Sequence, residues 1–260
     1  MCLIALDWRP NEHKSLILAA NRDEFYGRPS ESARYWKDQP HIYGGRDLLL
    51  GGTWLGCSTT GRLATVTNYF RKEDIEKKYP KSRGEIITKF CSSELPAKTF
   101  AQKLEEFKDE YSGFSALLFD GRNLVCCSNR DPDQFTQELP EGTYGLSNHL
   151  LDTSWPKVEK VKQSLSKVTR HMAQDHLVEI LLKEMADTVR VCEKSFLPTT
   201  LGEEEERVRS SVFVKGTEFG TRTTTIVTFD DRSGFDFTEK NHKTPFSGPS
   251  CSNEKIPCKK

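Results

Sequence analysis

Short apolar segments separated by turn residues recur along the first half of the chain and predict β-hairpins. Cys2–Leu6 and Leu16–Ala20 are apolar, and the stretch between them contains the turn formers Pro10 and Asn11. The same pattern predicts two further hairpins, Thr53–Ser58 with Leu63–Asn68 and Phe114–Phe119 with Asn123–Ser128. The chain is therefore expected to begin with antiparallel sheet.

The middle of the chain changes to a helical period. In Pro96–Tyr111, apolar residues recur at i, i+4 and i+7 (Phe100, Leu104 and Phe107), which predicts one buried stripe. Further helices are predicted at Gly84–Phe90, Trp155–Val168 and His176–Met185. Gly142–Gly145 is expected to lie in a loop.

Strands are expected again near the end of the chain, at Arg207–Lys215, Arg222–Asp230 and Phe235–Glu239, after an acidic run (Glu203–Glu206) that is expected to form a solvated loop or helix start. Strands first and last with helical segments between them favour an α+β fold. We expect a four-layer αββα sandwich, in which two antiparallel sheets pack together and helices cover their outer faces. Residues 1–240 are expected to form a single domain. The polar composition of residues 241–260 predicts a disordered tail.

Composition excludes several classes of function. Lys plus Arg and Asp plus Glu number 38 each, so no net field attracts nucleic acid, although a local basic pocket is compatible with this balance. No run of about 18 apolar residues occurs, so no transmembrane segment is expected. The eight cysteines have no repeated CxxC spacing, which predicts neither a disulfide framework nor a metal site and favours a cytoplasmic compartment. Adjacent Cys126 and Cys127 are expected to point to opposite faces of a strand.

Cys2 is the first candidate for chemistry. Removal of Met1, which the small cysteine side chain permits, would place a thiol and an α-amine on one residue. An α-amine with a pKa of about 7.7–8.0 can accept the thiol proton. The alternative is a cysteine that follows the initiator methionine by chance, so position 2 does not decide by itself.

Four polar residues, Asn21-Arg22-Asp23-Glu24, follow the apolar strand that is predicted to pair with the strand of Cys2. Strand alternation places Asn21 and Asp23 on one face and the other two on the opposite face. A carboxylate would orient a nearby α-ammonium, and Arg22 would neutralise negative charge or bind an anionic ligand. The alternative is a charged loop in which Arg22 pairs with an acid.

Three further polar residues lie at ends of predicted strands: Asn68, Asn148 and Arg222. A side-chain amide at a strand end can donate to a developing oxyanion. Turn capping or surface pairing explains each residue alone, but their shared location predicts a site along the rim of a sheet. Trp54 is a candidate apolar wall for this site, or alternatively a core residue.

Six motifs occur in order along the chain: Met1-Cys2, Ala20–Phe25, Gly51–Gly56, Thr67–Tyr69, Tyr144–Asn148 and Gly220–Thr223. Together they resemble the NRDE family, which includes the transport and Golgi organisation 2 proteins, and the resemblance extends from Met1 to about Glu239. The family in turn is distantly similar to cysteine-type N-terminal-nucleophile (Ntn) hydrolases that cleave bile-salt and penicillin V amides. This likeness implies an Ntn-hydrolase-like fold.

The likeness also implies catalytic roles. Cys2 would be nucleophile and base, and Asp23 would orient its amine. Asn68 and Asn148 would provide the oxyanion and amine-side contacts, and Arg222 would be a distal polar support.

One departure from the acylase pattern concerns an arginine. The acylases carry it immediately before their Asn-x-Asp, where this chain has Ala20, whereas Arg22 lies inside the motif. Strand alternation predicts that Arg22 points away from the face of Asp23.

The family resemblance and the residue chemistry favour different functions. The family is linked to intracellular haem trafficking and to lipid or acyl-CoA handling, with mitochondrial association, which implies a protein that carries haem or an acyl thioester. No cofactor is expected to be required, and haem is a candidate ligand. The ligand-binding residues would be Asn21, Arg22, Asp23, Glu24 and Trp54, and Arg22 with Arg222 would hold propionates or phosphates.

The residue chemistry alone ranks hydrolysis of a small linear amide through an acyl-Cys2 intermediate first. Both functions stay open on the sequence, and the family resemblance favours trafficking of haem or acyl groups, with hydrolysis as the alternative. A third, a scaffold for membrane-traffic partners, has no lipidation or amphipathic motif in its favour.

Overall fold

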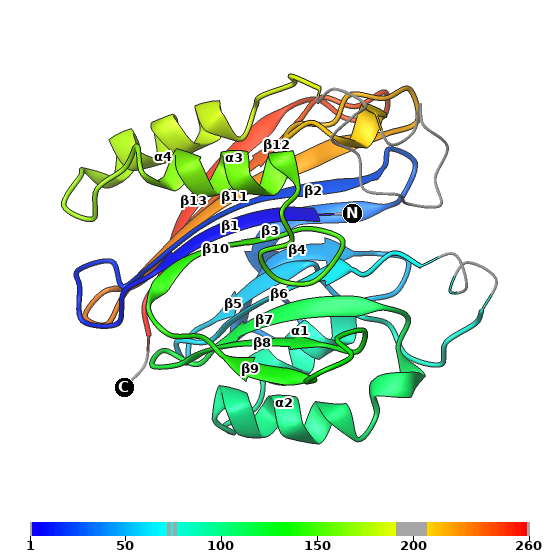
Figure 1. Cartoon of the computed structure of the whole chain (residues 1–260). Coiled ribbons are helices and arrows are strands. Elements are labelled where there is room, and N and C mark those ends of the chain that lie inside the picture. Colours follow the sequence, from blue (N-terminus) through cyan, green and yellow to red (C-terminus); the bar gives the residue numbers. More distant parts are fainter. Residues whose placement is uncertain (1, 72–73, 75–76, 191–206, 259–260) are drawn as a thin grey trace.

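The computed structural model describes residues 2–71, 74, 77–190 and 207–258, and its strands form two antiparallel sheets (Figure 1). The first sheet has the order β10-β1-β2-β11-β12-β13, with bounds Gly142–Leu146, Cys2–Trp8, Leu16–Phe25, Phe219–Asp230, Gly234–Asn241 and Ser250–Ile256. The second sheet runs from β3 to β9 in chain order: Ser30–Tyr35, Ile42–Asp47, Leu55–Ser58, Leu63–Asn68, Phe114–Phe119, Leu124–Ser128 and Thr136–Glu138. All three hairpins predicted from the first half of the chain are present.

Helices cover the outer faces of both sheets. In Figure 1, α3 (Pro156–Leu165) and α4 (Gln174–Glu184) lie over the first sheet, and α1 (Gly84–Cys91) and α2 (Ala97–Glu105) lie against the second. The predicted αββα sandwich is thus confirmed. None of the described helices combines the length and hydropathy that a membrane span requires.

Alternation along the paired strands β1 and β2 separates two hydrophobic cores. Ile4 and Ala20 are buried between the sheets, whereas Leu3 and Ala19 are buried beneath α3 and α4. A third core packs α1 and α2 against the second sheet. The predicted opposition of neighbouring cysteines is confirmed, since Cys126 faces the inter-sheet core and its neighbour faces the helices.

The predicted helix at Pro96–Tyr111 is shorter in the structure. It ends at Glu105, and a 3₁₀ turn follows at Lys108–Glu110. Leu104 is buried, but Phe107 is 46% exposed because the helix has ended before it. The expectation of a continuous stripe that includes Phe107 is therefore wrong.

Several strands lie where the polar composition of the sequence predicts a loop. The Asn21–Glu24 segment lies inside β2 and does not follow it, since β1 and β11 flank β2 and bond its backbone on both sides. Gly142–Gly145 belongs to β10, which pairs with β1. Strands β3 and β4 were not expected.

The prediction of a disordered tail from residue 241 is wrong. Ser250–Ile256 forms the edge strand β13, and Ile256 is fully buried in the inter-sheet core. The composition misleads because an edge strand exposes most of its side chains to water.

The prediction of a strand at Arg207–Lys215 is also wrong. Residues 207–209 are helical, and the next strand, β11, begins at Phe219. The acidic run Glu203–Glu206 lies outside the described residues.

Candidate functional site

Cys2 begins β1 and lies opposite Arg22 of β2 in the antiparallel register. Residues directly opposite each other present their side chains on the same face. Two residues further along, Ile4 and Ala20 form a pair on the same face that is buried between the sheets, so Cys2 and Arg22 also point to the inner face. Both line a pocket of about 300 Å³ at this end of the strands. The alternation predicted for Arg22 is confirmed, and the register adds that the thiol shares its face.

Both sheets and the start of α1 supply the pocket wall. β2 and the turn after it provide Asp23, Glu24, Phe25 and Arg28. The second sheet and the loops beside it provide Thr53, Trp54, Val66 and Asn68, and the approach to α1 provides Lys81–Gly84. The predicted residues Cys2, Arg22, Asp23, Glu24, Trp54 and Asn68 therefore come together around one pocket.

Arg22 is fixed by an aromatic contact. It is 5% exposed, its Cζ lies 3.9 Å from the centre of the Trp54 ring, and its Nη1 donates to Ser30 Oγ at 3.4 Å. No carboxylate of the described residues lies within 4.0 Å of its guanidinium. Gly45 makes this stack possible, because a Cβ there would lie 2.4 Å from the Trp54 ring. The pocket thus contains a buried arginine whose charge is not matched by an ion pair.

Burial controls the Cys2 thiol. Cys2 is 8% exposed, and this desolvation raises the pKa of its thiol, an effect that Arg22 partly offsets. Ser147 Oγ donates to the Cys2 carbonyl at 3.2 Å and so fixes the backbone. Because a protonated thiol is a poor nucleophile, reaction at Cys2 requires a nearby base.

Asp23 lies beside the nitrogen end of Cys2. The register pairs Cys2 with Arg22, and antiparallel pairing directs the Cys2 nitrogen toward the next residue, Asp23. Asp23 Oδ1 accepts a hydrogen bond from Thr221 Oγ1 at 2.6 Å. Burial raises the pKa of the Asp23 carboxyl, and the charge of buried Lys157 opposes that shift. This position agrees with the predicted role of orienting an amine.

Lys157 belongs to the surroundings of Asp23, and the sequence reasoning missed it. It is 6% exposed in the first turn of α3, and its Nζ donates to the Arg209 carbonyl at 3.0 Å. Burial lowers the pKa of Lys157, and Asp23 raises it. Its sequence context, directly after Pro156, carries no signal that would distinguish it from a surface lysine.

Asn68 and Asn148 have different positions relative to the pocket. Asn68 lines the pocket, whereas Asn148 is absent from the lining and is 2% exposed. Asn148 Nδ2 donates to the Asn68 carbonyl at 3.2 Å, and its Oδ1 accepts from Ser147 Oγ at 3.3 Å. Asn148 therefore holds Asn68 in place from outside the pocket lining, and its implied oxyanion or amine-side role stays a prediction.

Asn21 does not reach the pocket, which contradicts its predicted role in ligand binding. It is fully buried on the outer face, where its Nδ2 donates to the carbonyls of Met185 and Val212 at 2.8 and 2.9 Å. Its Oδ1 accepts from Thr224 Oγ1 at 2.6 Å. Its amide nitrogen thus attaches the end of α4 and the segment of Val212 to the sheet, and its oxygen bonds to the neighbouring strand β11.

Arg222 is also absent from the pocket lining. It lies at the register shift in β11, between Thr221 and Thr223, and donates from Nη1 to the carbonyls of Phe25, at 3.2 Å, and Arg28. It therefore stabilises the turn that carries Arg28 from outside the pocket lining.

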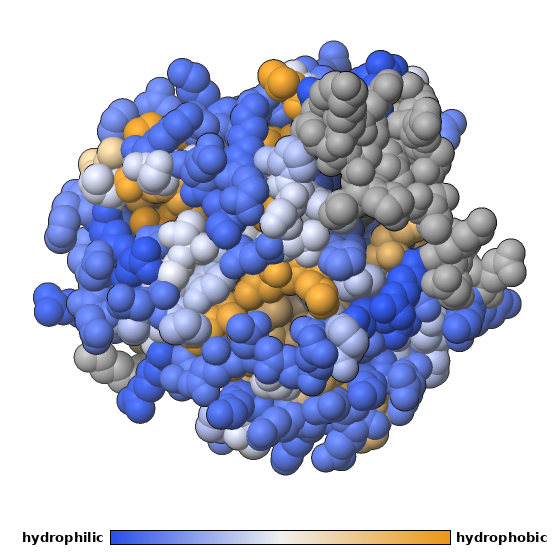
Figure 2. Space-filling view, in the orientation of Figure 1, coloured by the Kyte–Doolittle hydropathy of each residue, from blue (hydrophilic) through white to orange (hydrophobic). Residues whose placement is uncertain are grey.

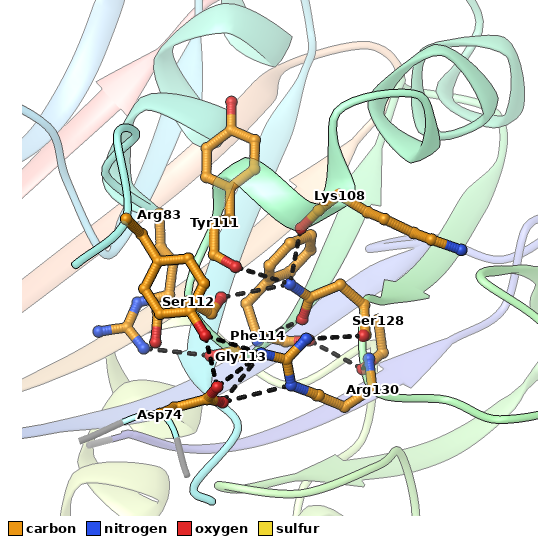
Figure 3. Close-up of polar contacts among 11 residues, drawn as sticks. Asp74, Arg83, Lys108, Tyr111, Ser112, Gly113, Phe114, Ser128 and Arg130 are labelled. Atoms are coloured by element: carbon orange, nitrogen blue, oxygen red, sulfur yellow. Dashed lines mark hydrogen bonds and ion pairs between the residues drawn. The ribbon is translucent and has the colours of Figure 1, made fainter. Parts of the chain in front are cut away.

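Arg83 is a pocket residue that the sequence reasoning missed. Its Nη1 donates to the Gly113 carbonyl at 3.1 Å, and beside it Asp74 accepts hydrogen bonds from Arg130 and Tyr79 (Figure 3). Burial lowers the pKa of Arg83, yet an arginine stays protonated. Its only sequence signal is the glycine pair that brings α1 close: a Cβ on Gly52 would lie 2.6 Å from the Gly84 carbonyl carbon.

The pocket cations divide into two groups. Arg28 pairs with Asp47 at 2.7 Å, and Lys81 pairs with Glu110 at 2.7 Å. Arg22 and Arg83 make no ion pair with any described residue and donate only to a hydroxyl and a carbonyl. The pocket thus contains two arginines without an ion pair to a described residue, in a lining that also includes Asp23, Glu24 and Asp47. No cluster of three or more metal-ligating side chains occurs among the described residues.

Comparisons with known proteins match this chain to one family over most of its length. The family model described as Transport and Golgi organisation 2 matches residues 1–244. A human Transport and Golgi organization protein 2 homolog is 36% identical over 93% of both chains, and the Drosophila melanogaster protein is 27% identical over 89% of this chain and 87% of its own.

Among solved structures, the N-acylethanolamine-hydrolyzing acid amidase ortholog of Caenorhabditis elegans aligns with a TM-score of 0.52 at 10% identity, covering 86% of this chain and 92% of that one. The C2A mutant of conjugated bile acid hydrolase from Clostridium perfringens aligns at 0.50 and 8% identity, over 98% and 92%. These two structures establish an Ntn-hydrolase fold.

Proposed function

The chain belongs to the transport and Golgi organisation 2 family, and we propose that it hydrolyses a small linear amide bearing a carboxylate or phosphate, with Cys2 as N-terminal nucleophile. One observation carries this proposal: the Cys2 thiol lines a pocket, Arg22 lies opposite it on the same face, and Asp23 lies toward its nitrogen. Of the two solved structures with the same fold, one is named an acid amidase and the other a conjugated bile acid hydrolase, which supports hydrolysis as the reaction class.

The first half of the reaction begins after removal of Met1. The Cys2 α-amine accepts the thiol proton while Sγ attacks the amide carbonyl carbon, forming a C–S bond and a tetrahedral oxyanion. The α-ammonium then protonates the amide nitrogen, the C–N bond breaks, and the amine leaves. The lining residue Asn68 is a candidate amide donor to the oxyanion.

The second half releases the acyl group. Water attacks the thioester carbonyl and the α-amine accepts a proton from that water. The C–S bond then breaks and the α-ammonium returns the proton to the departing sulfur, which gives a carboxylic acid, the Cys2 thiol and the neutral amine. Asp23 favours the charged form of the amine throughout, since a carboxylate stabilises a nearby ammonium.

Arg22 and Arg83 define the class of substrate. A guanidinium without an ion-pair partner favours binding of a carboxylate or a phosphate, which it can contact with two parallel hydrogen bonds. A matched pair of amides that differ only in a terminal carboxylate should therefore be hydrolysed at different rates, the anionic one faster.

A second candidate is carriage of haem or an acyl thioester, which both have anionic groups for the same two arginines. Binding of such a ligand would not require the Cys2 thiol to react. Carriage therefore predicts that affinity persists in Cys2→Ala, whereas hydrolysis predicts that turnover is lost in this variant.

The test starts with intact-mass analysis of the purified protein, followed by release of amine from N-acyl amino acids. We expect a mass without Met1 and turnover that is lost in Cys2→Ala, with Cys251→Ala, an exposed cysteine on β13, as the matched control. Full activity in protein that retains Met1 would reject the mechanism. Saturable haem or acyl-thioester binding without turnover would replace it with carriage.

A further inference from the structure

Three consecutive leucines are exposed in the loop between β4 and β5. Leu48, Leu49 and Leu50 are 51%, 62% and 58% exposed. Figure 2 shows one face of the molecule, on which hydrophobic residues form separate patches in a mainly hydrophilic surface. A run of three exposed apolar residues is unfavourable for a surface loop unless it has a function.

The loop is held in this conformation by its backbone. Asp47 Oδ1 accepts hydrogen bonds from the amides of Leu49 and Leu50 at 2.9 and 3.1 Å, and the Asp47 carbonyl accepts from Gly51 at 2.9 Å. Gly51 has φ +76°, a conformation that favours glycine. Asp47 itself is fixed by Arg28 at 2.7 Å. These contacts keep the leucine side chains out of the core.

The same loop borders the Cys2 pocket. Leu50 lines the pocket, as does Phe25, which is 54% exposed. Four basic residues line the pocket with them, against three acidic ones; Arg28 and Lys81 are paired with carboxylates, whereas Arg22 and Arg83 make no ion pair with a described residue. Apolar side chains that project beside basic ones match a membrane surface, where acyl chains lie just beneath anionic headgroups.

We propose that the Leu48–Leu50 loop inserts into the surface of an anionic lipid bilayer and thereby places the mouth of the Cys2 pocket on the membrane. The neutral net charge of the chain does not oppose this docking, because the attraction acts locally, within about 10 Å of the headgroups. The proposal concerns where the pocket acts and does not depend on its reaction.

The test is co-sedimentation with vesicles of phosphatidylcholine alone and with 30% phosphatidylserine, where the percentage is roughly that of an anionic leaflet. We expect binding that favours the anionic vesicles and falls by about tenfold or more when Leu48, Leu49 and Leu50 are all replaced by Ser, since the apolar contact is lost. Leu49→Asp, which changes only the most exposed leucine, should lower binding in the same direction if the triple variant does not fold.

The matched control is Phe246→Ser, because Phe246 is 74% exposed but does not line the pocket, and its binding should be unchanged. No binding by the wild type, or equal binding by Leu49→Asp, would overturn the proposal. So would a concentration-dependent dimer that Leu49→Asp abolishes, because the loop would then bind a second copy of the chain. Equal binding to neutral vesicles would overturn the anionic assignment.

Discussion

Cys2 and Arg22 lie directly opposite each other where β1 and β2 pair, so the thiol and the guanidinium share the inner face of the first sheet. Asp23, the next residue of β2, carries its carboxylate on the outer face, where it meets Thr221 and Lys157. The two faces of the first sheet therefore have different roles at this strand end. The inner face presents the nucleophile and an anion-binding group, and the outer face holds the charge that would orient the amine.

The first prediction concerns the influence of Arg22 on the thiol. Arg22→Met removes a positive charge that lowers the pKa of Cys2, so that pKa should rise further. A higher pKa lowers the thiolate fraction, so alkylation of Cys2 by iodoacetamide at neutral pH should slow by about 3- to 10-fold. The measurement is the pH dependence of the alkylation rate at Cys2, followed by peptide mass spectrometry.

Arg22→Lys is the control for this prediction. It keeps the charge but loses the planar contact with Trp54, so the alkylation rate should stay closer to that of the wild type. Equal rates in Arg22→Met and the wild type would show that burial alone determines the reactivity of Cys2.

The second prediction concerns the support beneath Trp54. Gly45→Ala places a Cβ 2.4 Å from the Trp54 ring, so the ring must move and Arg22 loses its contact. We expect a loss of about 1–3 kcal/mol in the free energy of unfolding, as for other overpacked sites. Urea denaturation measures the loss, and Gly27→Ala is the control, because no heavy atom lies within 4 Å of a Cβ at Gly27. Equal stability of the two variants would contradict the prediction.

The amino-acid pattern predicted the layers of the fold because burial is periodic in the strands at both ends of the chain. The pattern does not predict burial where polar residues are buried only because their strand pairs with a neighbouring strand on each side. The segment Asn21–Glu24 is polar yet buried at three of its four positions, since strands flank it on both sides. At the other extreme, Ser250–Ile256 is polar because it forms an edge, and composition resembles disorder there.

The candidate site was predictable only in part, because tertiary contacts that the sequence does not show place some of its residues. Cys2, Asp23 and Asn68 could be assigned because their motifs lie at strand ends that one rim brings together. Arg83 could not be assigned, since its place depends on the close backbone approach of Gly52 to Gly84, a tertiary contact. Asn21 was assigned to ligand binding because alternation identifies a face but does not show what covers that face.

The third prediction concerns the hydroxyl that holds Asp23. Thr221 Oγ1 donates to Asp23 and accepts from the Val214 amide at 2.9 Å, so Thr221→Val removes both hydrogen bonds at a buried position. A loss of about 2–4 kcal/mol in unfolding free energy is expected. Loss of this hydrogen bond should also raise the pKa of Asp23. Thr221→Ser, which keeps the hydroxyl, should remain within about 1 kcal/mol of the wild type. A small effect of Thr221→Val on the unfolding free energy would mean that Asp23 is held by its other contacts.

The last prediction concerns acid stability and His242. Burial lowers the pKa of His242 from 6.5 to about 4, and Nε2 lies 2.8 Å from Thr224 Oγ1. Because the folded-state pKa is below the unfolded value, His242 contributes stability that is complete above pH 6.5 and is lost as the pH falls toward 4. The loss attributable to this residue is at most about 3 kcal/mol. His242→Gln should flatten the decline between these pH values in urea unfolding, whereas His149→Gln, at a second half-buried histidine whose pKa burial lowers, should leave the contribution of His242 in place. If His242→Gln and the wild type lose stability in parallel from pH 6.5 to 4, His242 binds its proton at the same pH in the folded and unfolded protein, and burial beside Thr224 does not lower its pKa.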